Sequence, residues 1–472
     1  MSDRKTPRPK ARLPRGFRDR GAEEIARERA VVEKIRAVYE SYGFEPLETP
    51  AFEYTDALGK FLPDTDRPNE GVFSLKDDDG QWLSLRYDLT APLARYVAEN
   101  FQNLPKPFRR YQVGQVWRNE KPGPGRYREF TQCDADTVGS NSPAADAELL
   151  MMLADTLDAL GLKGQYAILI NNRRVLDGIM DAAKIDASRK GTVLRALDKL
   201  DRLGVDGVRQ LLGAGRKDES GDFTKGAELS ENQIETVLTF PTRKSLAGIE
   251  IGAGGQAAYD ELVSIRNIVD STHGEGHIVL DPGVVRGLDY YTGLVFEAQL
   301  KFPVKNEKGE EVVFGSVAGG GRYDDLVSRF TGQQVPAVGF SIGVSRLLSA
   351  LQERAPVALD PLVVVLALDD TARSFAMARE LRGAGLRAEA YVGNRKFGDQ
   401  LKYADKRGAA VAVIEGADER ARGEVTLKDL ALGAELSKSV ESRAAWVKDR
   451  PAQISVKRGD LVAEVRKMLA RH

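Results

Sequence analysis

The sequence predicts an α/β protein of the α+β kind, with a second, smaller α/β domain at its C-terminal end. Three observations predict it: a long β-hairpin over residues 111–138, a charged and mostly helical stretch over residues 174–276, and alternating strands and helices beyond residue 361. The chain has 472 residues, which exceeds the size at which one hydrophobic core usually stops growing. Two or three domains are therefore expected.

The first elements are predicted from periodicity and turn residues. A helix is expected over Ala22–Tyr42, where apolar residues approximate a helical period and Gly43 is placed to end it. A strand over Trp82–Arg86 leads into the turn Tyr87–Thr90, and a helix then extends to about Phe101. This turn and the hairpin that follows contain most of the polar residues discussed below.

The hairpin is predicted by two strand patterns between Tyr111 and Val138. The loop KPGPGRYRE between them has enough proline and glycine to force a long connection. A helix over Ala144–Gly161 and a strand over Tyr166–Asn171 complete this part of the chain. Residues 174–276 follow as an inserted module, predicted to be mostly helical.

Strand patterns return at His277–Asp281 and Gly293–Leu300. The glycine-rich segment AGGGRYDDL then precedes an apolar helix predicted over Ile342–Leu351. The segment ERAPVALDP is typical of a linker. Beyond it, LVVVLAL, RAEAYV and AAVAVIEG are predicted strands separated by helices, which indicates a small α/β domain.

Composition excludes several kinds of site. The chain has one cysteine, Cys133, expected to be packed, and three histidines, which argues against a disulfide, a Cys/His zinc site or a Cys-His dyad. No apolar run approaches the ~20 residues that cross a bilayer, and the N-terminus lacks the apolar segment of a secretory signal. We therefore expect no membrane contact and a cytoplasmic location, with chemistry that depends on carboxylates, arginines and tyrosines.

The net charge is −1, so the molecule as a whole is not strongly attracted to nucleic acid. Residues 1–13 nevertheless form a basic N-terminal arm broken by prolines. This arm is interpreted equally well as an RNA contact or as a solvated tail, and a mitochondrial transit peptide is a third interpretation.

The hairpin brings together side chains that suit a nucleotide and a small polar ligand. Alternation places Arg118 and Glu120 on one face of the first strand, and the second strand aligns Phe130, Gln132, Asp134 and Asp136. An arginine binds phosphate in a fork, an aromatic ring stacks on a purine, and carboxylates orient a polar substrate. The alternative is a hairpin with a solvated, charged face.

Four segments resemble a known family. The segment YQVGQVWRNEKPGPGRYREFTQCDAD, residues 111–136, resembles the second signature motif of class II aminoacyl-tRNA synthetases in the form found in histidyl-tRNA synthetases. VVRGLDYYTGLVFE (284–297) and AGGGRYDDLV (318–327) are similar to the histidine-binding segments of that family, and AVGFSIGVSRLL (337–348) resembles the third class II motif. The resemblance extends from about Pro14 into the C-terminal domain, apart from most of the inserted module.

The resemblance implies a class II antiparallel-sheet catalytic core with a helical insertion and a C-terminal anticodon-binding domain. The expected parts are catalytic residues 14–173 and 277–353, the inserted module 174–276 and the anticodon-binding domain 361–472. It also implies activation of L-histidine with ATP and Mg²⁺, transfer to tRNA(His), and a homodimer that involves the segment Ala22–Pro50. Arg395, Lys396, Lys402 and Lys406 would suit the phosphate backbone of tRNA, although a solvated helix face would look the same.

The resemblance assigns the nucleotide contacts to arginines and one aromatic ring. Arg118 and Arg286 would act on the α-phosphate, and Arg126 and Arg346 on the outer phosphates, which makes Arg118, Arg286 and Arg346 the expected catalytic residues. Phe130 would stack on the adenine and Glu120 would bond its edge. Arg346 also has a local argument, because the first turn of a helix favours an anion.

The histidine contacts are assigned in the same way. Tyr291 and Asp136 would hold the two ring nitrogens, and Tyr323 would close the pocket. The α-ammonium would be received by Asp88, Thr90 and Gln132. Arg286 is a permanent cation for the carboxylate, and Tyr290 or Tyr291 has a neutral hydroxyl for the imidazole.

One residue departs from the family pattern. Ser345 stands where class II enzymes commonly have a glutamate, which puts one magnesium-linked or hydrogen-bonding contact in doubt; no side-chain metal ligand is assigned. The alternative function is a synthetase-like regulatory subunit that binds histidine and tunes ATP phosphoribosyltransferase. Such proteins generally lack the anticodon domain and the ATP arginines, whereas this chain has both.

Overall fold

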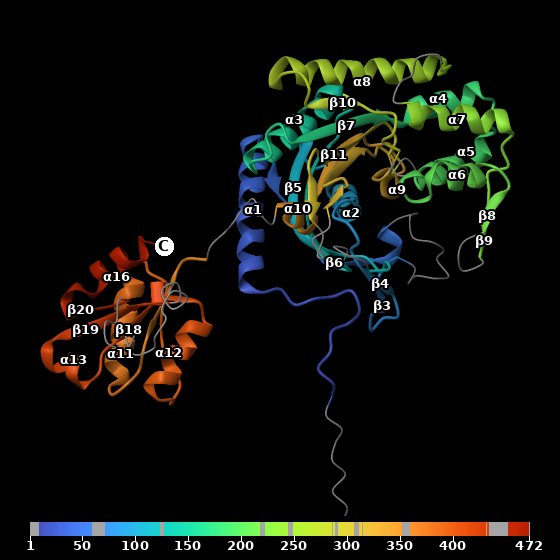
Figure 1. The fold of residues 1–472 in the computed structure, drawn as a ribbon. Coiled ribbons are helices and arrows are strands. Elements are labelled where there is room, and N and C mark those ends of the chain that lie inside the picture. The colour runs from blue at the N-terminus through green and yellow to red at the C-terminus, as the bar shows by residue number, and fades with distance from the viewer. Residues whose placement is uncertain are drawn as a thin grey trace, which may run out of the picture. The chain divides into compact units, whose positions relative to one another are not determined.

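The computed structural model describes residues 9–58, 71–122, 127–217, 222–243, 249–285, 287, 291–305, 311–313, 315–351, 359–430, 432–433 and 452–471. The chain divides into two compact units, Met1–Pro356 and Val357–His472 (Figure 1). The division falls within the segment ERAPVALDP, where the sequence predicts a linker.

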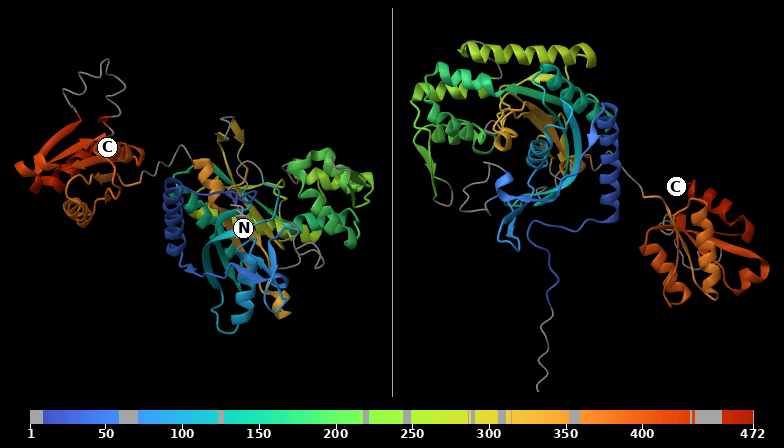
Figure 2. Two further views of the ribbon diagram at one scale, coloured as in Figure 1. Left: turned by 90° about the horizontal axis from the view of Figure 1, so that it is seen from below. Right: turned by 180° about the vertical axis from the view of Figure 1, so that it is seen from behind.

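A mostly antiparallel sheet forms the centre of the first unit (Figure 2). Among the described residues it has eight strands in the order β1-β5-β6-β15-β14-β11-β7-β10, and only the pairs β1–β5 and β7–β10 are parallel. The strands are β1 (Glu45–Pro46), β5 (Phe108–Trp117), β6 (Glu129–Val138), β7 (Tyr166–Asn172), β10 (Ile278–Leu280), β11 (Leu294–Leu300), β14 (Ala318–Arg322) and β15 (Ala337–Gly343). The predicted hairpin is thus confirmed as β5 and β6.

Helices cover one face of this sheet and leave the other for the site. The helices α1 (Ala22–Ser41), α3 (Pro143–Ala159), α10 (Val344–Leu351) and the second half of α8 (Gly252–His273) pack into one core. Cys133 and Ala135 of β6 point into that core, and both are fully buried. Since neighbouring strand residues alternate, Gln132, Asp134 and Asp136 lie on the opposite face.

Two strands near the site were not predicted. The glycine-rich segment 318–322 forms the central strand β14, and the predicted helix over Ile342–Leu351 begins only at Val344, because Ile342 still belongs to β15. A Cβ on Gly320 would collide with the carbonyl of Gly339, so glycine is required where these strands meet. Glycine weakens a strand pattern, which is why the sequence does not reveal β14.

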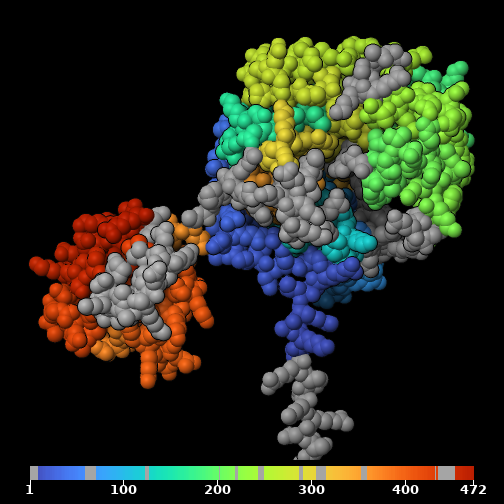
Figure 3. Space-filling view, in the orientation of Figure 1, coloured from blue at the N-terminus to red at the C-terminus, as the bar shows by residue number. Residues whose placement is uncertain are grey.

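The inserted module forms one lobe of the first unit, in green in Figure 3, with its own hydrophobic core. Its elements are α4 (Arg173–Ala182), α5 (Ala187–Leu197), α6 (Leu200–Leu212), β8 (Gly215–Lys217), β9 (Phe223–Lys225), α7 (Glu231–Arg243) and the first half of α8. Val284 and Val285, which follow the module in sequence, are buried in this core. The module therefore supports the chain next to Gly287.

The first unit has further small elements beside the main sheet. These are β2 (Phe52–Tyr54), η1 (Thr55–Leu58), β3 (Ser74–Lys76), β4 (Trp82–Leu85), α2 (Thr90–Asn100), β12 (Pro303–Lys305), β13 (Glu311–Val313) and α9 (Ser328–Thr331). Strands β2, β4 and β3 form a separate antiparallel sheet. The turn after β4 leads into α2 and carries Asp88 and Thr90 to the edge of the site.

The second unit is a small α/β domain, as predicted. Its sheet has the order β17-β16-β18-β19-β20, with β16 parallel to both β17 and β18. The elements are β16 (Leu362–Val365), α11 (Thr371–Gly383), β17 (Ala388–Ala390), α12 (Phe397–Lys406), β18 (Ala409–Ile414), α13 (Ala417–Arg422), β19 (Glu424–Asp429), β20 (Gln453–Lys457), η2 (Arg458–Asp460) and α16 (Leu461–Leu469). In neither unit do the described residues include a helix with the length and apolar character of a membrane span.

Candidate active site

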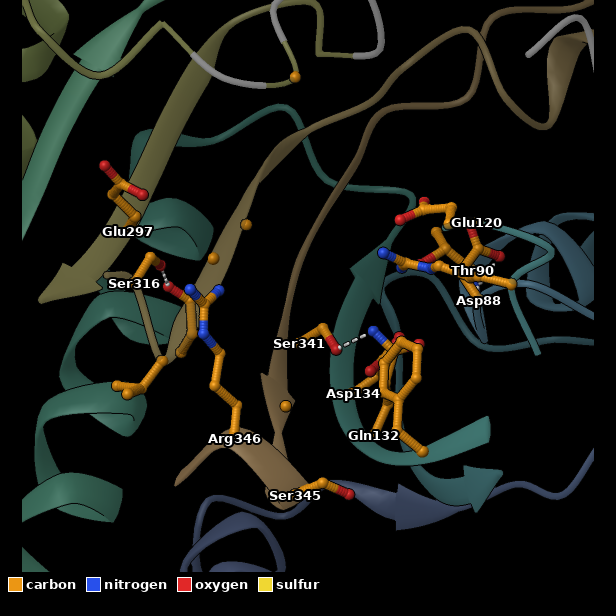
Figure 4. A pocket seen from close by; sticks show the side chains of 18 of the residues that line it. Asp88, Thr90, Glu120, Gln132, Asp134, Glu297, Ser316, Ser341, Ser345 and Arg346 are labelled. Carbon is orange, nitrogen blue, oxygen red and sulfur yellow. Dashed lines mark hydrogen bonds between the residues drawn. The ribbon is translucent and has the colours of Figure 1, made fainter. Parts of the chain in front are cut away.

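A cleft of about 590 Å³ opens on the face of the main sheet that the helices leave free. It is walled by the turn after β4, the β5–β6 hairpin, β11, β14, β15 and the start of α10 (Figure 4). Most of the predicted site residues that the structure describes line it: Asp88, Thr90, Arg118, Glu120, Phe130, Gln132, Tyr291 and Arg346. Segments far apart in sequence thus meet at one place.

The hairpin forms the floor of the cleft through the pairing of β5 with β6. Asp134 lies opposite Gln112 and Asp136 lies opposite Arg110 in this ladder. Both carboxylates are only 2% exposed. Because a solvated charged face would leave them in water, that interpretation of the hairpin is wrong.

Arg118 and Phe130 lie together at one end of the cleft. The guanidinium carbon of Arg118 lies 5.1 Å from the centre of the Phe130 ring, and its Nε donates to the carbonyl of Tyr87 at 3.1 Å. Arg118 and Glu120 lie just past the end of β5, yet both line the cleft as the alternation argument expected. A stacking ring beside a fixed cation suits a purine nucleotide with its phosphates.

Asp88 combines a structural contact with a place in the cleft wall. Its Oδ1 accepts hydrogen bonds from the backbone N–H groups of Thr90 and Ala91, at the start of α2. Burial nevertheless raises the pKa of Asp88 above its usual range, against the lowering effect of these bonds and of Arg118. A cation placed here would therefore be stabilised by a poorly solvated carboxylate.

Asp134, which alternation placed on the ligand face without a specific contact, and Ser341, which the sequence did not single out, also belong to the site. Gln132 Nε2 donates to Ser341 Oγ at 2.7 Å (Figure 4). Ser341 lies opposite Asp134 in the pairing of β15 with β6, and its hydroxyl lowers the pKa of that carboxyl. Asp134 Oδ1 and Gln132 Oε1 have no hydrogen-bond partner within the described residues. Two acceptors without partners in a cleft wall indicate a site for a donor-rich ligand such as an ammonium group.

Burial, and next to it the charge of Asp136, raises the pKa of Asp134 from 3.8 to about 8. A raised carboxyl pKa means that the folded chain holds a proton that the unfolded chain has lost, so this group lowers stability as the pH rises from about 4 to 8. Asp134→Asn is therefore expected to gain stability over the parent chain with rising pH, by roughly 1 kcal/mol or more between pH 5.5 and 8.5. Urea denaturation of both proteins over this pH range measures the difference in their free energies of unfolding. A difference that does not change with pH would mean that Asp134 has an ordinary pKa.

Asp136 and Tyr323 lie behind the cleft wall and do not line it. The Tyr323 hydroxyl donates to Asp136 Oδ1, and Asp136 Oδ2 lies 2.9 Å from the guanidinium of Arg110. Burial raises the pKa of Asp136 above its usual range, whereas Arg110 and Tyr323 lower it. A Cβ on Gly339 would strike Asp136, so glycine in β15 makes room for this carboxylate.

Arg346 marks the opposite end of the cleft. It lies near the start of α10, with Ser316 and Glu297 on the same side in Figure 4 and Ser345 beside it. A Cβ on Gly315 would come within 3.1 Å of the Arg346 guanidinium, so the chain passes close to it. The cleft thus has a cation near the start of a helix, which favours an anionic group.

Tyr291 is held between two glycines. Its ring would meet a Cβ on either Gly287 or Gly321, and burial raises its pKa well above the usual tyrosine range. The hydroxyl therefore stays neutral, as a hydrogen-bonding group for an imidazole requires. The predicted residues Arg126, Arg286 and Tyr290 lie outside the described residues.

Comparison with known proteins gives one consistent family. Residues 16–347 match the model of the family described as "Histidyl-tRNA synthetase", and residues 362–468 match an "Anticodon binding domain". A relative from Rhizobium meliloti (strain 1021) named "Histidine--tRNA ligase" is 58% identical over 99% of this chain and 97% of its own length. A relative of the same name from Brucella abortus (strain S19) is 55% identical over 99% of this chain and 98% of its own length.

Two solved structures are similar as well. The crystal structure of histidyl-tRNA synthetase from Nostoc sp. PCC 7120 has a TM-score of 0.70 at 28% identity and covers 98% of this chain and 100% of its own. An ATP phosphoribosyltransferase regulatory subunit/histidyl-tRNA synthetase from Bacillus halodurans has a TM-score of 0.65 at 22% identity and covers 84% of this chain and 97% of its own. The second likeness concerns the fold alone.

Proposed function

The chain belongs to the histidyl-tRNA synthetase family, and from that premise we propose how its cleft carries out the reaction. The activity is that of a histidine–tRNA ligase: the histidine carboxylate attacks the α-phosphate of ATP, pyrophosphate leaves, and histidine is then transferred to the 3′ end of tRNA(His). The observation that carries the proposal is a cleft lined by two aspartates, the buried Asp134 and the half-buried Asp88, with arginines at both ends. An amino acid zwitterion and a polyphosphate need these two kinds of environment.

The adenylation step needs positioning and charge stabilisation, and no side-chain nucleophile. Phe130 stacks the adenine, Glu120 bonds its edge, and Arg118 stabilises the charge that develops on the α-phosphate. Arg346 holds the outer phosphates at the other end of the cleft. Arg126 and Arg286 complete the set by family resemblance.

The histidine substrate is placed by the floor and the tyrosines. Asp88, Thr90 and Gln132 receive the α-ammonium, and the acceptors of Asp134 and Gln132 that lack partners support this placement. Tyr291 bonds the imidazole at the cleft wall, and Asp136, which Tyr323 fixes behind that wall, is proposed to take the second ring nitrogen when histidine is bound. Tyr290 would add a neutral hydroxyl by family resemblance.

Mg²⁺ is proposed as the companion of ATP. The described residues contain no group of three carboxylates or imidazoles that would hold a metal by itself. Glu297 is the carboxylate at the Arg346 end of the cleft, and Mg²⁺ is commonly bound by one carboxylate together with phosphates and waters. Bound there with ATP, the ion would neutralise phosphate charge, while Ser345 supplies a hydroxyl where the family commonly has a glutamate.

We further propose that the second unit reads the anticodon of tRNA(His). Around the start of α12, exposed apolar side chains stand among basic ones: Val392, Arg395, Lys396, Phe397 and Lys402. Cations that follow a phosphate backbone, interleaved with apolar surface for bases, are typical of single-stranded RNA binding. Lys406 extends the basic surface along the helix.

A homodimer is proposed on the basis of an exposed apolar sheet face. Phe52, Tyr54 and Leu75 share one face of the β2–β4–β3 sheet, and each is more than 40% exposed. A contiguous apolar face of this kind marks an interaction surface, here for a second copy of this chain, together with the segment Ala22–Pro50.

The cytoplasmic location stays a prediction from the sequence.

The regulatory-subunit alternative is disfavoured because the second unit matches an anticodon-binding domain. The formation of histidyl-tRNA distinguishes the two functions. A ligase forms histidyl-tRNA from ATP, histidine and tRNA(His), whereas a regulatory subunit forms no histidyl-tRNA. Acid-gel separation of charged from uncharged tRNA after incubation with the chain tests the proposal, and the absence of charged tRNA would exclude it.

A further inference from the structure

Arg110 is a fully buried arginine that neither the sequence patterns nor the family resemblance singled out. It lies in β5 opposite Asp136, and its side chain is 0% exposed. One terminal nitrogen, NH2, donates to the carbonyl of Leu89 at 2.9 Å and lies 2.9 Å from Asp136 Oδ2. A buried guanidinium needs such partners, since an uncompensated charge in the interior is costly.

The two partners of Arg110 belong to two different halves of the proposed histidine site. Leu89 lies between Asp88 and Thr90, in the turn proposed to receive the α-ammonium. Asp136 is proposed to hold the imidazole. The Arg110 side chain therefore lies behind the cleft wall and connects both halves through one nitrogen.

We propose that Arg110 positions the groups that bind histidine. Arg110 joins the turn that binds the ammonium group to the carboxylate that binds the imidazole, and its positive charge balances the aspartates around the cleft floor. The inference rests on the proposed function, because the two halves are defined by it. Arg110 touches no substrate in this arrangement and acts through Leu89 and Asp136. The nucleotide end of the cleft, around Arg118 and Phe130, is not among its contacts.

The charges around Arg110 explain why a cation is needed. Three carboxylates face it: the buried Asp134 and Asp136 from β6 and the half-buried Asp88 from the turn. Tyr323 is bonded to Asp136, and Arg86 is a second buried cation nearby. Arg110 lowers the pKa of all three carboxyl groups, against the raising effect of burial. Without Arg110 these groups would hold protons to higher pH and bind a cationic ligand less well.

Two substitutions test the proposal, with a matched control on the same strand. Arg110→Met removes the charge, and Arg110→Lys keeps it but loses the planar fork. The control is Arg109→Met, because Arg109 points to the other face of β5, where it pairs with Glu148 at 2.6 Å. Pyrophosphate exchange then gives KM for histidine and KM for ATP separately in each variant.

We expect Arg110→Met to raise KM for histidine by roughly 30-fold or more, as removal of one partner of a buried charge pair usually does. Arg110→Lys should raise it about 10-fold or less, and KM for ATP should stay within about 3-fold in both variants. The acid limb of the kcat/KM profile for histidine should move to higher pH in Arg110→Met and stay in place in Arg110→Lys. The Arg109 control should show neither change.

The outcomes separate this inference from the proposed function. If the parent chain shows no histidine-dependent exchange, the proposed function fails. Suppose the parent chain is active. If both Arg110 variants then change KM for histidine and KM for ATP by the same factor, or if both keep the pH profile of the parent chain, Arg110 has only a structural role and the inference is overturned. If thermal melting shows that Arg110→Met does not fold, Arg110→Lys tests the inference instead. A larger rise in KM for histidine than in KM for ATP supports it, and an equal rise overturns it.

Discussion

Replacing Arg118 by alanine is expected to lower kcat/KM for pyrophosphate exchange by about 10²–10³, because it removes a preorganised cation from the transferring phosphate. The fold should survive, since Arg118 lines the cleft and, within the described part of the chain, its side chain contacts the carbonyl of Tyr87 and the Phe130 ring. Arg118→Lys should recover only part of the loss, because an ammonium cannot form the bidentate contact. Steady-state exchange at saturating and subsaturating ATP measures both variants.

A matched control distinguishes a catalytic loss from a general one. Arg379→Ala removes an exposed arginine from α11 in the second unit and should leave exchange unchanged. Far-ultraviolet circular dichroism should be the same for all of these proteins. If Arg118→Ala kept more than about a third of the parent kcat/KM, Arg118 would have no role in phosphate stabilisation.

Deleting residues 357–472 is expected to spare histidine adenylation and to lower kcat/KM for tRNA charging by roughly 10²-fold or more, as loss of a whole binding surface does. The first unit keeps its cleft and core, because the deleted unit has hydrophobic clusters of its own. Exchange and aminoacylation rates of the shortened and full chains are measured side by side.

A milder change in the full chain tests the same surface without a truncation. Arg395→Ala combined with Lys396→Ala should weaken charging by a smaller factor and reduce its sensitivity to salt, because fewer phosphates are neutralised. Exchange should be unaffected. Charging that is unchanged in both the truncated and the substituted chain would remove the second unit from tRNA recognition.

The hairpin could be predicted from sequence because its signals are local. Alternation over residues 129–138 and the proline-rich loop are sufficient to place two antiparallel strands, and the structure confirms both. Alternation also put Phe130, Gln132, Asp134 and Asp136 on one face. It could not say that this face is buried, since that depends on the turn at Leu89 and on Tyr323, which contact this face from elsewhere in the chain.

Other features depend on contacts that no local pattern encodes. The strand β14 is rich in glycine because Phe340, Tyr291 and neighbouring carbonyls occupy the space of its side chains, and the same glycines hide it from a strand pattern. Arg110 looks like a surface arginine in the run Arg109-Arg110, and it is buried only because the distant turn at Leu89 packs on its face of β5, where Asp136 lies opposite it. Ser341 is missed for the same reason, because its partners Gln132 and Asp134 come from a distant strand.

The inserted module has a closer relation to the site than its sequence indicates. The side chain of Asp198, at the end of α5, accepts a hydrogen bond from the backbone N–H of Gly287 at 3.0 Å. Val284 and Val285 are buried in the core of the module. The segment that leads to the tyrosines of the histidine site is therefore fixed by the module as well as by the sheet.

The most direct test of the central claim is amino-acid-dependent exchange of labelled pyrophosphate into ATP by the purified full chain. We predict exchange with L-histidine and none above background with the other amino acids, because the cleft joins an acidic floor and a neutral tyrosine hydroxyl to a nucleotide site. Exchange that does not depend on histidine, or that a different amino acid supports better, would contradict the account.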